Sequence, residues 1–106
     1  MYYLYVIKMW VEDTDKEYLK IGYSTNMPKR ISQLKISSPF PLTCIQLAGP
    51  FSLSDVKSIE KRMHSFFYEG RMIGEWFCVD SDEVFPKLVQ LTRKFDEEAN
   101  VASFRY

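Results

Sequence analysis

Apolar and polar residues follow one another along the chain with periods that predict strands and helices in turn. Segment 2–9, which is rich in tyrosine, valine and isoleucine, is typical of a strand, and 18–23 and 42–48 are two further strand candidates. The polar stretch 10–17 joins the first two strands, which indicates a hairpin and hence an antiparallel pair. The dipeptide Gly49-Pro50 is expected to end the third strand.

Three other segments repeat their apolar residues at the spacing of a helix that packs one face on a core. They are 27–36, 55–68 and a last segment that begins at the acids 81–83 and runs to about 97. Residues suited to cap a helix precede the first two: Ser24, Thr25 and Asn26 for one, Ser52 or Ser54 for the other. A short extended segment is expected at 75–79. The tail from Asn100 has no period and is expected to be loose.

The order of these elements predicts an α+β fold rather than a wound parallel sheet. We expect a small three-stranded antiparallel β-sheet flanked by helices, with a C-terminal helix and tail over 80–106. A chain of 106 residues without internal repeats or linkers is expected to form a single domain, 1–106.

Composition narrows the class of protein. Hydrophobic residues make up 46% and charged residues 26%, as in soluble globular domains. The longest apolar run, 1–7, is too short to span a membrane and has no basic segment before it, so no membrane association is expected. Cys44, Cys78 and the single histidine, His64, cannot form a structural zinc site. We therefore expect a cytoplasmic protein with free thiols.

The net charge is zero, but basic residues are concentrated in the middle of the chain. Segment 18–79 holds eight lysines and arginines against four acids, a net charge of +4, while 12–17 and 80–106 are acidic. A segment of this sign can face a phosphate backbone, although solvent-exposed helix faces carry similar charges.

The chain lacks the common catalytic motifs, namely a glycine-rich phosphate loop, a nucleophile elbow, H-E-x-x-H and C-x-x-C. What remains is a set of polar residues on the predicted elements. Tyr5 and Lys20 lie on the two strands of the hairpin, and Arg30 lies beside the apolar stripe of the first helix. Glu60 and His64 are four residues apart on the second helix and so share a face.

These residues have both a chemical and a structural interpretation. The Glu60 carboxylate can hold a hard divalent cation, and the Arg30 guanidinium can bind a phosphate. Equally, tyrosine in such a strand is often a core residue, lysine in a strand is often exposed, and Glu60 with His64 is often a surface pair.

The motifs that carry these residues are YLYVIK at 3–8, LKIGYSTN at 19–26, KR at 29–30, EKRMH at 60–64 and GEWF at 74–77. In this order and spacing the chain resembles the GIY-YIG nuclease superfamily over about residues 2–79. It is most similar to the subgroup of phage proteins and fungal meiotically up-regulated proteins, which has K-I-G in place of Y-I-G. Tyr3 replaces the family's first glycine, and Lys20 replaces its second tyrosine.

The resemblance implies a metal-dependent endonuclease that hydrolyses phosphodiester bonds, mostly in DNA, by in-line attack of water. One divalent ion, Mg²⁺ or Mn²⁺, is implied on Glu60, and Arg30 would stabilise charge on the phosphorus. We expect Tyr5 and Lys20 to contact the attacking water. The general base stays open among Tyr5, Lys20 and His64. Of these residue types only histidine titrates near neutral pH in its free form, so tyrosine or lysine would need a lowered pKa to act as the base.

Further residues are expected to bind the nucleic acid. Gly22 matches the motif glycine and would let the substrate approach the backbone closely. Lys29 and Lys61 would contact phosphates, and Tyr23 or Trp76 would stack on a base.

Two alternatives keep the fold without catalysis: a nucleic-acid-binding module that needs no metal, and a protein-interaction module. Since no second DNA-reading module accompanies the catalytic residues, an active enzyme would be helped by a second copy of the chain, as a homodimer, or by a separate DNA-targeting partner.

Overall fold

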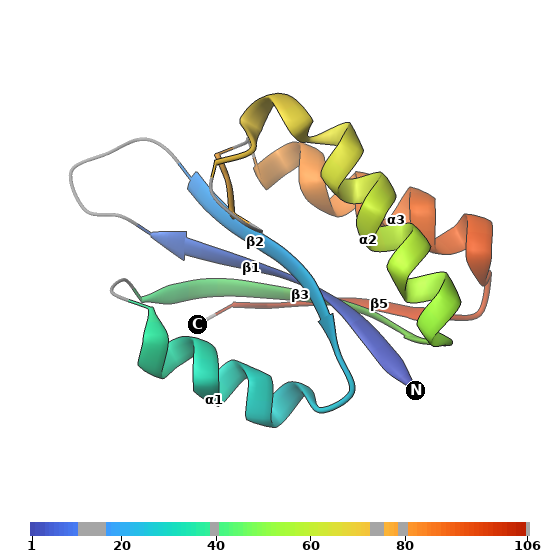
Figure 1. The fold of residues 1–106 in the computed structure, drawn as a ribbon, viewed down its shortest axis with the longest axis horizontal. Coiled ribbons are helices and arrows are strands. Elements are labelled where there is room, and N and C mark those ends of the chain that lie inside the picture. Colours follow the sequence, from blue (N-terminus) through green and yellow to red (C-terminus); the bar gives the residue numbers. More distant parts are fainter. Residues whose placement is uncertain (11–16, 39–40, 73–75, 79–80, 106) are drawn as a thin grey trace.

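The computed structural model describes residues 1–10, 17–38, 41–72, 76–78 and 81–105, which form one sheet with three helices (Figure 1). The strands are β1 (Tyr2–Trp10), β2 (Glu17–Ser24), β3 (Leu42–Phe51), β4 (Trp76–Cys78) and β5 (Asn100–Arg105). The helices are α1 (Met27–Ser37), α2 (Leu53–Phe66) and α3 (Ser81–Phe95), and a 3-10 turn, η1 (Tyr68–Gly70), follows α2. None of the described helices has the length and apolar character needed to cross a membrane.

The sheet has five strands in the order β4-β2-β1-β3-β5, and every neighbouring pair is antiparallel. The α+β class is confirmed, whereas the expected number of three strands is wrong. The three expected strands form the centre, β2-β1-β3, and the two short strands β4 and β5 extend it at its edges. The tail from Asn100 was expected to be loose, but it pairs with β3 because that strand offers an open edge and Val101 packs against the core.

The third strand also runs further than expected. Gly49 was expected to end it, but β3 continues to Phe51 with Gly49 at a φ of 145°. A Cβ atom on Gly49 would lie 2.9 Å from Cδ1 of Tyr3, and the pairing of β3 with β1 shifts its register next to this point. Glycine thus permits an irregularity within the strand instead of terminating it.

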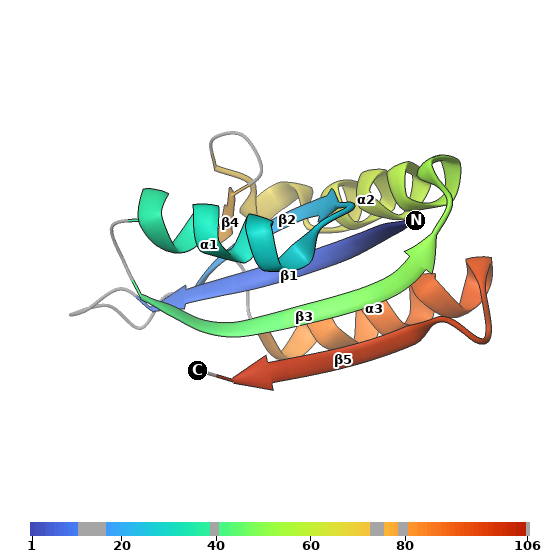
Figure 2. The same ribbon diagram turned by 90° about the horizontal axis from the view of Figure 1, so that it is seen from below.

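Helices cover both faces of the sheet, α1 on one face and α2 with α3 on the other (Figure 2). Alternate residues of β1 supply the two cores: Leu4 and Val6 face α2 and α3, while Tyr5, Ile7 and Met9 face α1. The smaller core, beneath α1, includes the site candidate Tyr5.

The helices begin where the capping residues indicate. Asn26 Oδ1 accepts the backbone N–H of Lys29 at 3.1 Å, and Ser52 Oγ accepts that of Asp55 at 3.2 Å. These contacts satisfy N–H groups that the first turn of a helix leaves without a partner. Because Ser52 is the cap, α2 begins at Leu53, two residues before the expected start.

Candidate functional site

A hydrogen bond joins α1 to the central strand. The Tyr5 side chain is only 1% exposed, on the α1 side of β1. Arg30, in the first turns of α1, donates from Nε to Tyr5 Oη at 3.1 Å, and its Cζ atom lies 5.8 Å from the centre of the tyrosine ring. The partly buried guanidinium is therefore held in a fixed place beside the phenol oxygen.

Gly22 lies directly beside this pair. It is the register partner of Tyr5 in the β1–β2 ladder, so a side chain at position 22 would project on the same face as Tyr5. Glycine adds no side chain beside the Tyr5 ring, and both residues are buried.

β4 and α2 both contact β2. In the described part of the chain, β4 pairs with residues 18–20 of β2. His64 on α2 reaches the next residue, with Nε2 3.0 Å from the backbone oxygen of Ile21. A carbonyl oxygen only accepts, so Nε2 donates and carries the ring proton in this contact. The ring also packs on Phe77 at a centroid distance of 5.0 Å, and together these contacts fix α2 against the edge of β2.

Glu60 lies one helical turn before His64 and is partly buried. Figure 1 shows that α2 runs antiparallel to β2. Four helical residues span about 6 Å, which corresponds to about two residues of a strand. Since His64 contacts Ile21, we expect Glu60 one turn further toward the C-terminal end of β2. α2 covers the face of the sheet opposite to α1, so Glu60 and His64 approach β2 from the other side than Tyr5 and Arg30.

Lys20 lies on the α1 side as well, but further along. Its register partner is Ile7, two residues from Tyr5, which is about 7 Å along the strand. Its Nζ atom lies 5.4 Å from the centre of the Trp76 ring, and both residues line a small pocket at the end of α1. The structure therefore pairs Lys20 with Trp76 and not with the Tyr5–Arg30 pair, and contact with the attacking water stays a prediction.

The residues expected to bind nucleic acid fall into two groups. Gly22, Lys29 and Trp76 lie on the α1 side, with Lys29 exposed on the helix. Tyr23 packs against the core on the opposite side, edge to face with Tyr2 at a centroid distance of 5.9 Å. Lys61 is exposed on α2, on a groove shared with α3. The motif residues Gly74 and Glu75 lie outside the described residues.

The described residues contain no group of three or more histidine, cysteine, aspartate or glutamate side chains that could hold a metal ion. The carboxylate of Glu60 is nevertheless a suitable ligand for a hard cation. Mg²⁺ commonly binds one or two carboxylates and takes its other ligands from water and substrate phosphates. The site fits an ion that binds together with its substrate rather than one held by the protein alone.

Sequence reasoning missed three residues that line the groove between α2 and α3, namely Arg62, Phe66 and Lys87. A signal for two of them was present in the sequence. Arg62 and Phe66 are four residues apart on α2 and so share a face of the helix, but this face becomes a groove only once α3 packs beside it.

Comparison with known proteins gives one family match. The model of the T5orf172 domain matches residues 2–89. No curated protein and no solved structure matches the chain. T5orf172 is a nuclease-associated family, which is consistent with a role related to DNA.

This match corrects the identification drawn from the motifs. The family is a different one from the GIY-YIG superfamily, of which no model matches, so the assignment to that superfamily and to its K-I-G subgroup was wrong. The assignment depended on short runs such as YLYVIK and LKIG. Aromatic and β-branched residues are common in strands in general, so such runs do not identify a family by themselves. The two departures at Tyr3 and Lys20 fall in those same runs.

Proposed function

Since the chain belongs to the T5orf172 domain family, we propose that it is a metal-dependent endonuclease that hydrolyses phosphodiester bonds in DNA. The observation that carries this proposal is the hydrogen bond from Arg30 to Tyr5, the register partner of Gly22. A nuclease needs a fixed cation for the phosphate and a group that handles the proton of the attacking water. Arg30 and Tyr5 would supply these two groups.

Arg30 is the phosphate-binding group of the proposal. A guanidinium has five N–H donors, and the bond to Tyr5 Oη engages one of them, at Nε. The donors on its two terminal nitrogens have the fork geometry that suits the oxygens of a phosphate. Held in place by Tyr5, they would stabilise the negative charge that grows on the phosphate during attack.

Tyr5 is the group that would handle the proton. The Tyr5 oxygen accepts from Arg30 and would exchange a proton with the attacking water or a phosphate oxygen once substrate is bound. Lys20 would bind a flanking phosphate from its position at Trp76. His64 donates a hydrogen bond from Nε2 to a backbone oxygen of β2, so its proposed role is to position α2 and with it Glu60.

Glu60 would hold one Mg²⁺ or Mn²⁺ at the edge of β2. Such an ion, when bound, supplies a Lewis acid for the oxygens of the phosphodiester. Glu60 is given this role because it lies on α2 one helical turn before His64, whose ring is hydrogen-bonded to the backbone of β2.

A second candidate function is a nucleic-acid-binding module without catalysis. Its contacts with the nucleic acid would come from the exposed basic side chains of Lys29 and Lys61. Such a module would bind DNA equally well with and without metal, and its affinity would fall steeply with salt.

Nicking of supercoiled plasmid in Mg²⁺ or Mn²⁺ tests the proposal, with Glu60→Gln as the variant and Glu69→Gln as the matched control on exposed η1. We expect cutting that EDTA stops, a loss of about 100-fold or more in Glu60→Gln, and no change in Glu69→Gln. Circular dichroism checks that both variants fold. A folded parent protein that fails to cut with either metal would refute the nuclease and leave the binding module.

A further inference from the structure

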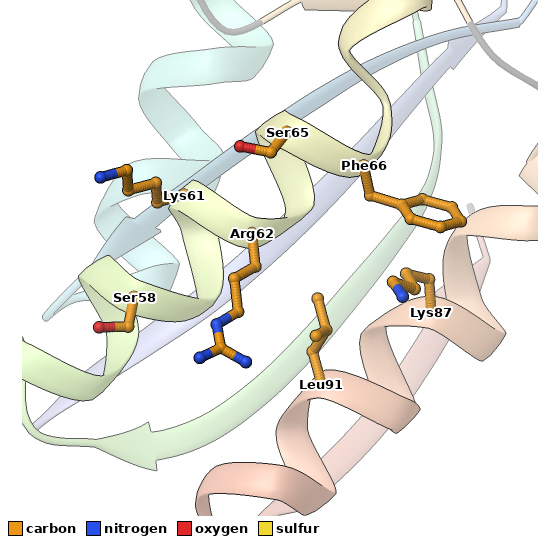
Figure 3. A pocket seen from close by; sticks show the side chains of 7 residues that line it. All are labelled: Ser58, Lys61, Arg62, Ser65, Phe66, Lys87 and Leu91. Carbon is orange, nitrogen blue, oxygen red and sulfur yellow. The ribbon is translucent and has the colours of Figure 1, made fainter.

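A groove runs between α2 and α3 on the outer side of the molecule (Figure 3). It has a volume of about 650 Å³. Its lining combines hydroxyl, cationic and apolar side chains: Ser58, Lys61, Arg62, Ser65, Phe66, Lys87 and Leu91. Figure 3 shows Arg62 and Phe66 pointing from α2 toward α3, with Leu91 and Lys87 facing them from α3.

The groove is cationic. Lys61, Arg62 and Lys87 line it, and no carboxylate does. The chain as a whole has a net charge of zero, so this concentration of positive charge is local. A lining of this kind attracts a polyanion.

Aromatic rings hold two of these cations in place. Lys87 Nζ lies 4.1 Å from the centre of the Phe66 ring, and Arg62 Cζ lies 5.1 Å from that of Phe95. The Phe66 ring also meets Phe67 edge to face at 4.9 Å, yet Phe66 remains 56% exposed. An exposed aromatic ring with fixed cations around it is the arrangement that binds single strands, by stacking on a base while the cations contact the backbone.

We propose that this groove binds a single-stranded segment of nucleic acid. The axes of packed helices are about 8–10 Å apart, so the groove is a narrow strip of surface over α2 and α3 rather than a channel between them, and a single strand can lie along it. The inference rests on the proposed function only in taking nucleic acid as the substrate, because no atom of the groove takes part in the cutting.

The order of residues on α2 connects the groove with the candidate site. Glu60, Lys61 and Arg62 are consecutive, so each is turned about 100° around the helix from the one before. Glu60 lies on the flank of α2 near β2, Arg62 points toward α3, and exposed Lys61 lies between them. A strand that leaves the edge of β2 would cross α2 over Lys61 and enter the groove. The substrate class would then be DNA with a single-stranded arm next to the cut.

Fluorescence anisotropy with a labelled 15-nucleotide oligothymidine tests the groove directly. It is run in EDTA, so that binding is measured whether or not the protein cuts. The variant is Arg62→Gln with Lys87→Gln, and the control, Lys35→Gln with Lys57→Gln, removes the same charge from exposed positions outside the groove.

Loss of two phosphate contacts on a single strand should lower the slope of log K against log salt by about 1.4, equivalent to about 25-fold weaker binding at 0.1 M salt. We expect this in the groove variant and a much smaller change in the control. Phe66→Ala should weaken binding about fivefold or more, with Phe104→Ala, another exposed aromatic, as its control.

Three results would overturn the inference: equal losses in the groove variant and the control, tighter binding of a 15-base-pair duplex than of the single strand, or preference for a poly-glutamate peptide over the oligonucleotide. Failure of the proposed function would look different, because the oligothymidine would still bind through the groove while the plasmid stayed uncut.

Discussion

Replacement of Tyr5 by phenylalanine separates the chemical part of this residue from its structural part. The ring remains and continues to fill its place in the core beneath α1, since Tyr5 is 1% exposed. Only the oxygen that accepts from Arg30 at 3.1 Å is lost. The proposal predicts that cutting falls by about 100-fold or more, the usual contribution of a group that transfers a proton.

The effect of Tyr5→Phe on the free energy of unfolding is expected to be much smaller than its effect on the cutting rate. A hydrogen bond with a charged partner contributes about 1.5–3 kcal/mol, and less here because Arg30 is only partly buried and water can replace the tyrosine oxygen. For Tyr5→Phe we therefore expect a loss of about 1 kcal/mol in the free energy of unfolding, which lowers Tm by about 4–8 °C in a domain of this size. A domain with an unfolding free energy of about 5 kcal/mol or more stays almost entirely folded after such a loss, so unfolding cannot account for a 100-fold fall in rate.

Two measurements on the same protein samples therefore answer the question: the nicking rate of supercoiled plasmid and Tm by circular dichroism. Tyr18→Phe is the control, since Tyr18 is a partly buried tyrosine on β2 two residues before Lys20. A double-mutant cycle of Tyr5→Phe with Arg30→Gln should give a coupling in stability of about 1 kcal/mol, which measures their bond alone. A Tyr5→Phe protein that cuts within about threefold of the parent rate, with Tm lowered as expected, would refute the proton-transfer part and leave Tyr5 as a support for Arg30.

Two further predictions concern the strand that carries an irregularity and the metal. Gly49→Ala should destabilise the fold by about 1–3 kcal/mol, because the new Cβ would lie 2.9 Å from Tyr3 Cδ1 and 3.0 Å from the Tyr2 oxygen, at a φ that suits glycine. Urea unfolding measures this loss, and an unchanged midpoint would contradict the prediction. Removal of metal by EDTA should stop cutting without lowering Tm, because the described residues hold no group of three metal ligands on which folding could depend; a clear drop of Tm in EDTA would point to a structural ion instead.

The parts of the fold that the sequence predicted are those with a long local period. The three helices and the strands of the β2-β1-β3 centre each extend over eight or more residues, enough for an apolar repeat to show. β4, with three residues, was expected only as a short extended segment at 75–79, and β5, with six, was expected to be loose, because neither is long enough to show a repeat. Their place is decided by the open edges of β2 and β3, which are contacts between distant segments that no local pattern records.

The candidate site was predictable in its members and not in its arrangement. Tyr5 and Arg30 were chosen from short motifs, and the structure joins them by a hydrogen bond. The place of Lys20 against Trp76 follows from the pairing of β2 with β4, which the sequence did not predict. His64 was a candidate base, but its bond to the Ile21 oxygen depends on how α2 packs against β2, which no local pattern records.

β2 is thus the element on which the candidate site depends. In the described part of the chain, β4 pairs with residues 18–20 of β2. The oxygen of the next residue, Ile21, accepts from His64 of α2. Gly22 follows, and its register partner, Tyr5, is bonded to α1. Three elements that are distant in the sequence therefore contact β2 between residues 18 and 22 or pair with its partner there, and no local pattern of the sequence records this arrangement.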